Sequence, residues 1–179
     1  MTLSAQAKNI CALSRKELAQ VFEDASAVDV DSIAGYRYRG VSLGLPKWIE
    51  KLSWKKFAKT FVRSNDGTVS GWNLRIEQDT LDTPWRPQMK RGAEWRFGNF
   101  GVCAIPNSPH IEINYGLGTS GLSPLRRLRD PLRSLDKDGD LLLGRSLVDV
   151  GIARRLGTPS WFVLERDQHA SCPDSKNKS

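Results

Sequence analysis

The sequence contains little cysteine and little histidine, and this scarcity removes several classes of chemistry. Its 179 residues include three cysteines (Cys11, Cys103 and Cys172) and two histidines (His110 and His169). A structural zinc site needs about four converging ligands, and these residues form neither a CxxC nor a Cys/His pattern. We therefore expect no metal and no cofactor. Three unpaired thiols also indicate a reducing, cytoplasmic compartment.

Long hydrophobic segments and nucleotide-binding or nucleophile motifs are missing as well. No window approaches the roughly 18 apolar residues of a membrane-spanning helix, and Met1–Ser14 is too polar for a secretion signal. The sequence has no GxSxG nucleophile elbow. Gly116–Gly121 matches GxGxxG, but no lysine or strand-to-helix context follows it, so a turn explains it better than a phosphate site.

The positive charge is considerable but divided. The net charge is +7 and the isoelectric point is near 9.5, which brings nucleic acid or another anionic partner into consideration. One group of basic residues is spaced at four residues: Lys47, Lys51, Lys55 and Lys59. The other is the arginine-rich segment 126–133, in which Asp130 is expected to form a structural ion pair with Arg126 or Arg133. The pattern favours a solvated helix face and a basic loop over a nucleic-acid footprint.

Helical signals are concentrated near the N-terminus. Ser14 and Glu17 form a capping box, and an apolar stripe follows, which predicts a helix over 14–25. The preceding residues 1–13 are expected to be loosely ordered.

A second helical region is predicted over 46–61, beginning at Pro46. Its two apolar sets lie on nearly opposite faces, so one straight helix cannot bury both. We therefore expect a break near Ser53, followed over 54–63 by a second short helix or, alternatively, a strand.

The remaining pattern alternates with period two and predicts antiparallel strands. The first predicted strand starts at Gly35. The others cover 69–77, 93–105, 110–115, 141–144 and 161–166. The 15 glycines and 9 prolines are spread along the chain, as expected for short elements joined by turns. We predict one mainly β domain over 14–166, an antiparallel barrel with N-terminal and capping helices, followed by a disordered tail over 167–179.

Several segments resemble a known family. Gly35-Tyr-Arg-Tyr-Arg-Gly40, a Leu-Pro helix and Trp54–Phe57 resemble the opening of the GXWXG-type lipocalin-like bacterial proteins, with one extra residue between the glycines and Tyr in place of Trp. Residues 128–133, 141–144 and 162–166 resemble the closing strands of such barrels. The resemblance covers roughly half the chain. It implies a calycin-like barrel with an interior ligand cavity, but no particular activity.

Aromatic residues on the predicted strands are the candidates for the cavity wall. Tyrosine and tryptophan combine a large apolar body with one polar group, which suits a semi-polar ligand. The alternative is that the rings simply fill the barrel. The candidate ligand-binding residues are Tyr36, Tyr38, Trp48, Trp72, Arg75, Trp95, Phe97, Tyr115, Arg145 and Trp161.

Charged residues within the strands raise a separate question. Arg75, Glu77, Arg145 and Glu165 are ordinary if they point outward, which we favour. A charge that points into the barrel must be paired or must mark a functional site, because its desolvation is costly. In that case Tyr115 with Glu77 could supply acid-base catalysis.

Three functions follow from this pattern. The favoured one is the binding of a small hydrophobic or amphipathic ligand in the cavity of the barrel. The first alternative is a metal-independent isomerase or cyclase that acts on a hydrophobic, natural-product-like substrate in the same cavity. The second is the binding of nucleic acid or another anionic partner through the basic face.

Overall fold

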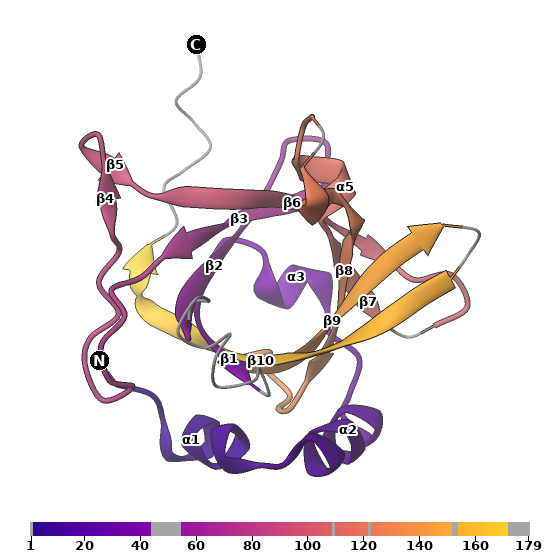
Figure 1. Ribbon diagram of the computed structural model, residues 1–179, viewed down its shortest axis with the longest axis horizontal. Coiled ribbons are helices and arrows are strands. Elements are labelled where there is room, and N and C mark those ends of the chain that lie inside the picture. The colour runs from indigo at the N-terminus through magenta and orange to yellow at the C-terminus, as the bar shows by residue number, and fades with distance from the viewer. Residues whose placement is uncertain (1, 44–54, 109, 122, 152–153, 172–179) are drawn as a thin grey trace.

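Eight antiparallel strands close into a barrel, as Figure 1 shows in a view along its interior. This computed structural model describes residues 2–43, 55–108, 110–121, 123–151 and 154–171. The strand order is β1-β10-β9-β8-β7-β6-β3-β2, so each strand pairs with its neighbour in the sequence and β10 closes the sheet on β1. The predicted fold class, a mainly β antiparallel barrel with a few helices, is confirmed.

The elements have the following bounds. The barrel strands are β1 (Tyr36–Leu43), β2 (Lys56–Arg63), β3 (Val69–Arg75), β6 (Arg96–Ala104), β7 (Ile111–Asn114), β8 (Leu128–Ser134), β9 (Leu141–Gly151) and β10 (Arg154–Ser171). A hairpin between β3 and β6 consists of β4 (Met89–Lys90) and β5 (Ala93–Glu94). The helical elements are α1 (Ala5–Ala12), α2 (Arg15–Asp24), α3 (Val30–Ile33), α5 (Tyr115–Gly118) and the 3-10 turn η1 (Pro124–Arg127).

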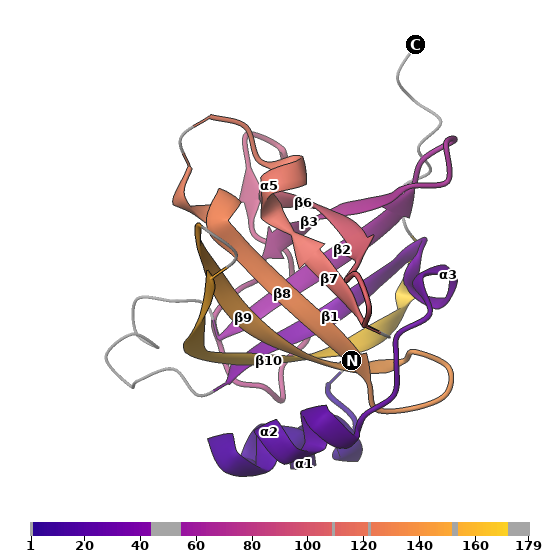
Figure 2. The same ribbon diagram turned by 90° about the vertical axis from the view of Figure 1, so that its right-hand side faces the viewer.

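The end of the barrel beside α3 has a solid aromatic core. Alternate residues of each strand point inward, and here their rings meet edge to face or tilted. The ring centroids of Tyr38 and Phe61 are 5.6 Å apart, and those of Phe61 and Phe100 are 5.4 Å apart. Ile33 of α3 is fully buried in the same cluster. Figure 2 shows α3 at this end, and Figure 1 shows the β9–β10 hairpin extending from the barrel.

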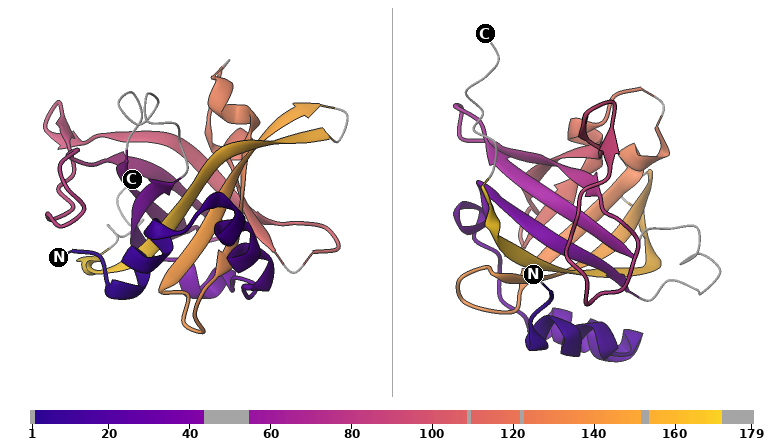
Figure 3. Two further views of the ribbon diagram at one scale, coloured as in Figure 1. Left: turned by 60° about the horizontal axis from the view of Figure 1, so that its bottom comes forward. Right: turned by 90° about the vertical axis from the view of Figure 1, so that its left-hand side faces the viewer.

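The N-terminal helices cover the outside of the barrel. Figure 3 shows α1 and α2 lying across the wall formed by β1, β9 and β10. The predicted capping box at the start of α2 is confirmed, because Ser14 and Glu17 bond each other's backbone amides. Phe22 of α2 packs edge to face on Trp161, with 5.6 Å between the ring centroids. The start of β9 is therefore buried on both faces, as predicted for residues 141–144.

Of the two alternatives for 54–63, the strand is confirmed and the helix is wrong where the structure describes this segment, because residues 56–63 form strand β2. Phe57 and Phe61 point into the barrel, while Ala58 packs in a separate cluster. Both faces of β2 are buried, so apolar residues occur in both phases and their spacing imitates a helix. Residues 46–54 lie outside the described residues.

Three boundaries also differ from the prediction. Residues 5–12 form a helix rather than a loose segment, since Ser4 caps it and Ala7 is buried. The last strand continues past residue 166 to Ser171. The arginine-rich segment 128–134 is strand β8 rather than a basic loop, as its resemblance to a closing strand implies, although it contains Pro131.

Proline fits into β8 because the ladder is interrupted at that point. Strand β8 pairs with β9 as far as Arg129, which lies opposite Leu147, and pairs again from Leu132, which lies opposite Gly144. The register skips the two residues between them, Asp130 and Pro131. A residue without an N–H group is tolerated where no ladder bond is made.

The predicted ion pair of Asp130 with Arg126 or Arg133 is wrong. The Arg126 side chain donates to the Gly121 carbonyl oxygen, and Arg133 pairs with Glu23. The charged group near Asp130 is the amino group of Lys59, 3.8 Å from its Oδ2 atom.

We expect Phe22→Ala to lower the free energy of unfolding by about 3 kcal/mol, because it removes the ring that anchors α2 on Trp161. Chemical denaturation followed by circular dichroism measures this. Gln20→Ala, on the exposed face of the same helix, should change stability by less than about 0.5 kcal/mol. Equal effects of the two substitutions would show that α2 does not depend on this contact.

Candidate functional site

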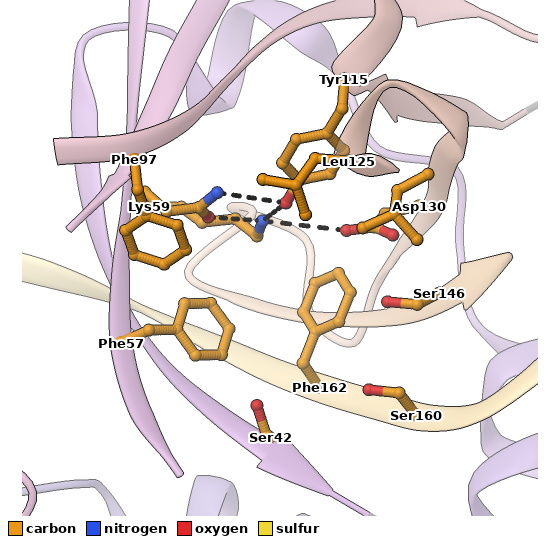
Figure 4. A pocket seen from close by; sticks show the side chains of 12 residues that line it. Ser42, Phe57, Lys59, Phe97, Tyr115, Leu125, Asp130, Ser146, Ser160 and Phe162 are labelled. Carbon is orange, nitrogen blue, oxygen red and sulfur yellow. Dashed lines mark hydrogen bonds and ion pairs between the residues drawn. The ribbon is translucent and has the colours of Figure 1, made fainter. Parts of the chain in front are cut away.

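A cavity of about 290 Å³ lies in the half of the barrel opposite α3. Figure 4 shows the side chains that surround it. Its apolar wall consists of Phe57, Phe97, Leu125, Leu128 and Phe162. Its polar lining consists of Ser42, Lys59, Asn73, Tyr115, Asp130, Ser146 and Ser160. These residues come from all the barrel strands except β7 and from α5 and η1, so only the closed barrel brings them together.

Two glycines make space for the aromatic wall. A Cβ atom on Gly144 would lie 2.1 Å from the ring of Phe162, and one on Gly40 would lie 2.4 Å from the ring of Phe57. Any larger residue at these positions would push the rings into the cavity. The two rings meet edge to face with their centroids 6.1 Å apart. The glycines therefore determine where the wall of the cavity lies.

Four residues form a polar cluster deep in the barrel: Lys59, Asn73, Tyr115 and Asp130. Lys59 Nζ donates hydrogen bonds to Asn73 Oδ1 at 2.8 Å and to the Tyr115 hydroxyl at 2.6 Å. Asn73 Nδ2 donates to the same hydroxyl at 3.3 Å. Asp130 Oδ2 lies 3.8 Å from Lys59 Nζ. Figure 4 shows Tyr115 and Asp130 pointing toward the amino group of Lys59.

Burial controls the charge state of the cluster. Lys59 is 2% exposed, and its burial lowers its pKa to about 8 although Asp130 acts in the opposite direction. Burial likewise raises the pKa of the Asp130 carboxyl group, against the effect of Lys59, and raises the pKa of Tyr115 well above its ordinary value. The neutral form of each of these groups is therefore favoured more strongly than it would be in water.

Aromatic rings surround the amino group on several sides. Lys59 Nζ lies 5.1 to 5.5 Å from the ring centroids of Phe57, Phe100, Tyr115 and Phe162. The faces of such rings attract a cation, which offsets part of the cost of burying the ammonium group. The site can therefore hold a nitrogen atom in either its neutral or its cationic form.

Asp130 has an unused acceptor atom. Hydrogen-bonding interactions with the hydroxyl groups of Ser146 and Tyr115 lower the pKa of this carboxyl group. Its Oδ1 atom, however, is buried and accepts no hydrogen bond from the described residues. A buried acceptor without a donor is costly. Because Asp130 lines the cavity, a molecule in the cavity could supply that donor.

Two of the predicted ligand-binding residues, Phe97 and Tyr115, line the cavity. Tyr38 also lies inside the barrel, but in the solid half, where its hydroxyl donates to the Gly139 carbonyl at 2.7 Å. Tyr36 is 42% exposed and lies against the guanidinium group of Arg166. Trp48 lies outside the described residues.

The structure does not bring the other five predicted ligand-binding residues to the cavity. On β3, the inward phase belongs to Gly71 and Asn73, so the neighbouring Trp72 packs outside, under Arg96. The remaining four residues form two arginine–tryptophan pairs. The Cζ atom of Arg75 lies 4.0 Å from the ring centroid of Trp95, and that of Arg145 lies 5.3 Å from the ring centroid of Trp161. The prediction assumed that the aromatic phase faces inward, but outer helices and loops bury aromatic residues equally well.

The predicted pair of Tyr115 and Glu77 is not assembled. Tyr115 is buried in the cavity, whereas Glu77 is exposed and does not line it. The carboxyl group that faces Tyr115 belongs to Asp130. The structure therefore supports a tyrosine in the site but places a different acid beside it.

Lys59, Asn73 and Asp130 were missed by the sequence reasoning. A signal for Lys59 was present, since it alternates with Phe57 and Phe61 on one phase of β2. The four-residue spacing of lysines instead suggested a solvated helix face. Once 56–63 is recognised as a strand, a lysine between two inward aromatic residues must itself point inward.

Comparisons with known proteins do not assign this chain to a family, so its class is described by its fold and its cavity. No model of a known protein family matches the sequence, and no curated protein matches it either. The protein has an eight-stranded antiparallel barrel, which is consistent with a calycin-like fold. Within the described part of the chain, no helix is long and apolar enough to cross a membrane. Among the same residues, no cluster of His, Cys, Asp or Glu is suited to hold a metal ion.

We expect Lys59→Met to destabilise the protein by about 3 kcal/mol at neutral pH, because it leaves the carboxyl group of Asp130 buried without its partner. Adding Asp130→Asn should restore most of that loss, since the buried charge is then gone. Urea denaturation of the two single variants and the double variant measures the coupling. Lys55→Met, at an exposed position, is the matched control and should have little effect. Strictly additive losses would contradict the coupling.

Stability should also depend on pH through Lys59. Its pKa is about 8 in the folded protein and 10.5 when unperturbed, so between these values the unfolded chain binds the extra proton. The free energy of unfolding therefore rises with pH in this window, by up to about 1.4 kcal/mol per pH unit from this group. Titrations of wild type and Lys59→Met isolate the effect. A constant difference between the two proteins across the window would rule it out.

Proposed function

We propose that this protein binds a small, partly apolar molecule inside the barrel, with the polar end of the molecule against Lys59, Tyr115 and Asp130. The observation that carries the proposal is the cavity itself, which combines an aromatic and aliphatic wall with a buried polar cluster. Ligand sites are typically apolar cavities in which a few polar groups fix the orientation. An ammonium group and a carboxyl group are costly in an interior that serves packing alone.

The dimensions of the cavity favour a small ligand. Its volume of about 290 Å³ is at the lower end of the range for ligand pockets, roughly 300 to 1,000 Å³. A single ring with a short side chain, or a short aliphatic chain, fits this space better than a sterol or a long-chain lipid.

The charges of the site favour a neutral polar group on the ligand. Lys59 and Asp130 carry opposite charges when both are ionised, so neither an anion nor a cation finds a net charge to balance. A hydroxyl group could donate to the unused Asp130 Oδ1, and a carbonyl oxygen could accept from Lys59 or Tyr115. We therefore favour an alcohol or a carbonyl compound over a carboxylate.

The resemblance to GXWXG-type lipocalin-like proteins is part of the proposal. Gly40, in the segment that carries the resemblance, allows the ring of Phe57 to lie against β1 in the cavity wall. This gives that glycine a role in shaping the cavity. A reducing, cytoplasmic location also fits, since Cys11 and Cys103 are free thiols.

An isomerase or cyclase that uses the same cavity is the second candidate. The observation that favours it is the 2.6 Å contact between Lys59 Nζ and the Tyr115 hydroxyl, which couples two proton-exchanging groups inside an apolar site. Tyr115 keeps its predicted catalytic role in this proposal. Glu77, which is exposed, does not.

Binding of nucleic acid has less support. Lys59, one of the four spaced lysines, lies inside the barrel. Arg155 pairs with Glu112 at 2.6 Å, and Arg129 pairs with Asp149 at 3.4 Å. These ion pairs neutralise part of the basic surface, which reduces the attraction for phosphates.

We expect the uncharged fluorophore aminoanthracene to bind at one saturable site, with little dependence on salt because no phosphate-like charge is involved. Leu128→Trp should abolish this binding, since it fills the cavity. Fluorescence titration measures both.

Leu156→Trp is the matched control, because Leu156 is 52% exposed and does not line the cavity. It should bind the probe as wild type does. Unchanged binding by Leu128→Trp would contradict the proposed function. Affinity for an oligonucleotide that falls steeply with salt would favour the basic face instead.

A further inference from the structure

We propose that Lys59 forms a reversible imine with a ligand that carries an aldehyde or ketone group. This inference rests on the proposed function and names the class of ligand that the cavity would take. It assigns a covalent role to one side chain, whereas the binding proposal needs only non-covalent contacts.

The first support is the position of the amino group. Lys59 lines the cavity, and its Nζ lies among four aromatic rings deep in the barrel. Hydrogen bonds from Nζ to Asn73 Oδ1 and to the Tyr115 hydroxyl hold it in one place. A ligand whose apolar body lies against Phe57 and Phe162 would therefore bring its polar end to a fixed nitrogen atom.

The second support is the reactivity that burial produces. Only an unprotonated amine has the lone pair that attacks a carbonyl carbon. Desolvation lowers the pKa of Lys59 to about 8, so an appreciable fraction is unprotonated near neutral pH. Lysines that form Schiff bases are activated by burial in this way.

The reaction balances with the groups present. The Lys59 nitrogen attacks the carbonyl carbon, and a C–N bond forms while the C=O bond becomes a single bond. Tyr115 donates its proton to that oxygen and recovers one from the nitrogen. Asp130, whose pKa is raised by burial, then donates a proton to the new hydroxyl group, the C–O bond breaks, and water leaves. A C=N bond remains, with the second amine hydrogen still on the nitrogen and the Asp130 carboxylate beside it. No oxidant or reductant is consumed.

The product would also be stabilised by the site. A protonated imine keeps a positive charge on the nitrogen, and Asp130 Oδ2, 3.8 Å from Nζ, provides the counter-charge. The four surrounding rings favour a cation as well.

A second buried lysine provides an internal comparison. Lys56 is 1% exposed, but it does not line the cavity. Its Nζ lies over the ring of Trp85 and bonds Asp79, Thr83 and the carbonyl oxygens of Thr80 and Pro84. This lysine is held by several oxygen atoms, away from the cavity. Lys56 therefore has the surroundings of a structural ion pair, whereas Lys59 has an amino group that faces a cavity.

The experiment uses hydrocinnamaldehyde as the probe, with sodium cyanoborohydride to reduce any imine to a stable amine. The full-length protein is incubated with both reagents, and peptide mapping by mass spectrometry locates the adduct. We expect a single major adduct on Lys59, formed faster than any on Lys56 or the exposed lysines. Hydrocinnamyl alcohol has the same shape without the carbonyl group, so it should slow the labelling by competition.

Two variants define the roles of the residues. Lys59→Arg keeps a cation in the cluster but cannot form the imine, so its cavity adduct should disappear. Tyr115→Phe keeps the lysine and the ring but removes the proton donor, and we expect it to slow adduct formation by about a hundredfold. Circular dichroism confirms that each variant is folded.

The outcomes separate this inference from the proposed function. If the aldehyde and the alcohol both displace aminoanthracene but Lys59 carries no adduct, the imine is refuted and the binding function stands. If the adducts are spread evenly over the exposed lysines, the imine is refuted as well. If neither compound displaces the fluorophore because the fluorophore never binds, the proposed function itself fails. A Lys59 adduct blocked by the alcohol supports both.

Discussion

The buried contact among Lys59, Tyr115, Asn73 and Asp130 is the interaction on which the interior of this barrel depends. These side chains come from β2, the start of α5, β3 and β8, so the hydrogen bonds and the ion pair connect widely separated parts of the sheet. Each partner lowers the cost of burying the others, because an unpaired charge in this interior would be strongly destabilising. The cluster therefore combines a structural constraint with the chemistry of the cavity.

The interior of the barrel contains a packed aromatic cluster beside α3 and a cavity in the other half. Beside α3, the rings of Tyr38, Phe61 and Phe100 pack edge to face or tilted against one another. In the other half, Gly40 and Gly144 let the wall rings lie back against the strands. Both interpretations of the inward aromatic residues, as packing and as a cavity wall, therefore apply to this barrel, each in its own half.

Several features of the fold could be read from local pattern, and the failures have a common cause. The capping box of Ser14 and Glu17 and the doubly buried start of β9 are local signals, and both are confirmed. The sequence pattern of β2 fits a helix as well as a strand, because both faces of the strand are buried and no alternation shows. Trp72 was placed inside because an aromatic phase was assumed to face the barrel, whereas it packs outside. Periodicity reports burial, but it does not say which side of a closed sheet buries a residue.

The sequence by itself determined the class of the protein. Period-two segments and turn signals were enough to predict an antiparallel barrel, and they placed Tyr115 and Phe97 among the candidates for the site. Only the tertiary structure decided that Lys59, Asn73 and Asp130 meet. Lys59 and Asp130 are 71 residues apart in the sequence numbering (130 − 59), and no local pattern encodes which residues of separate strands share one level of the interior. That level is set by the register of every strand around the closed barrel.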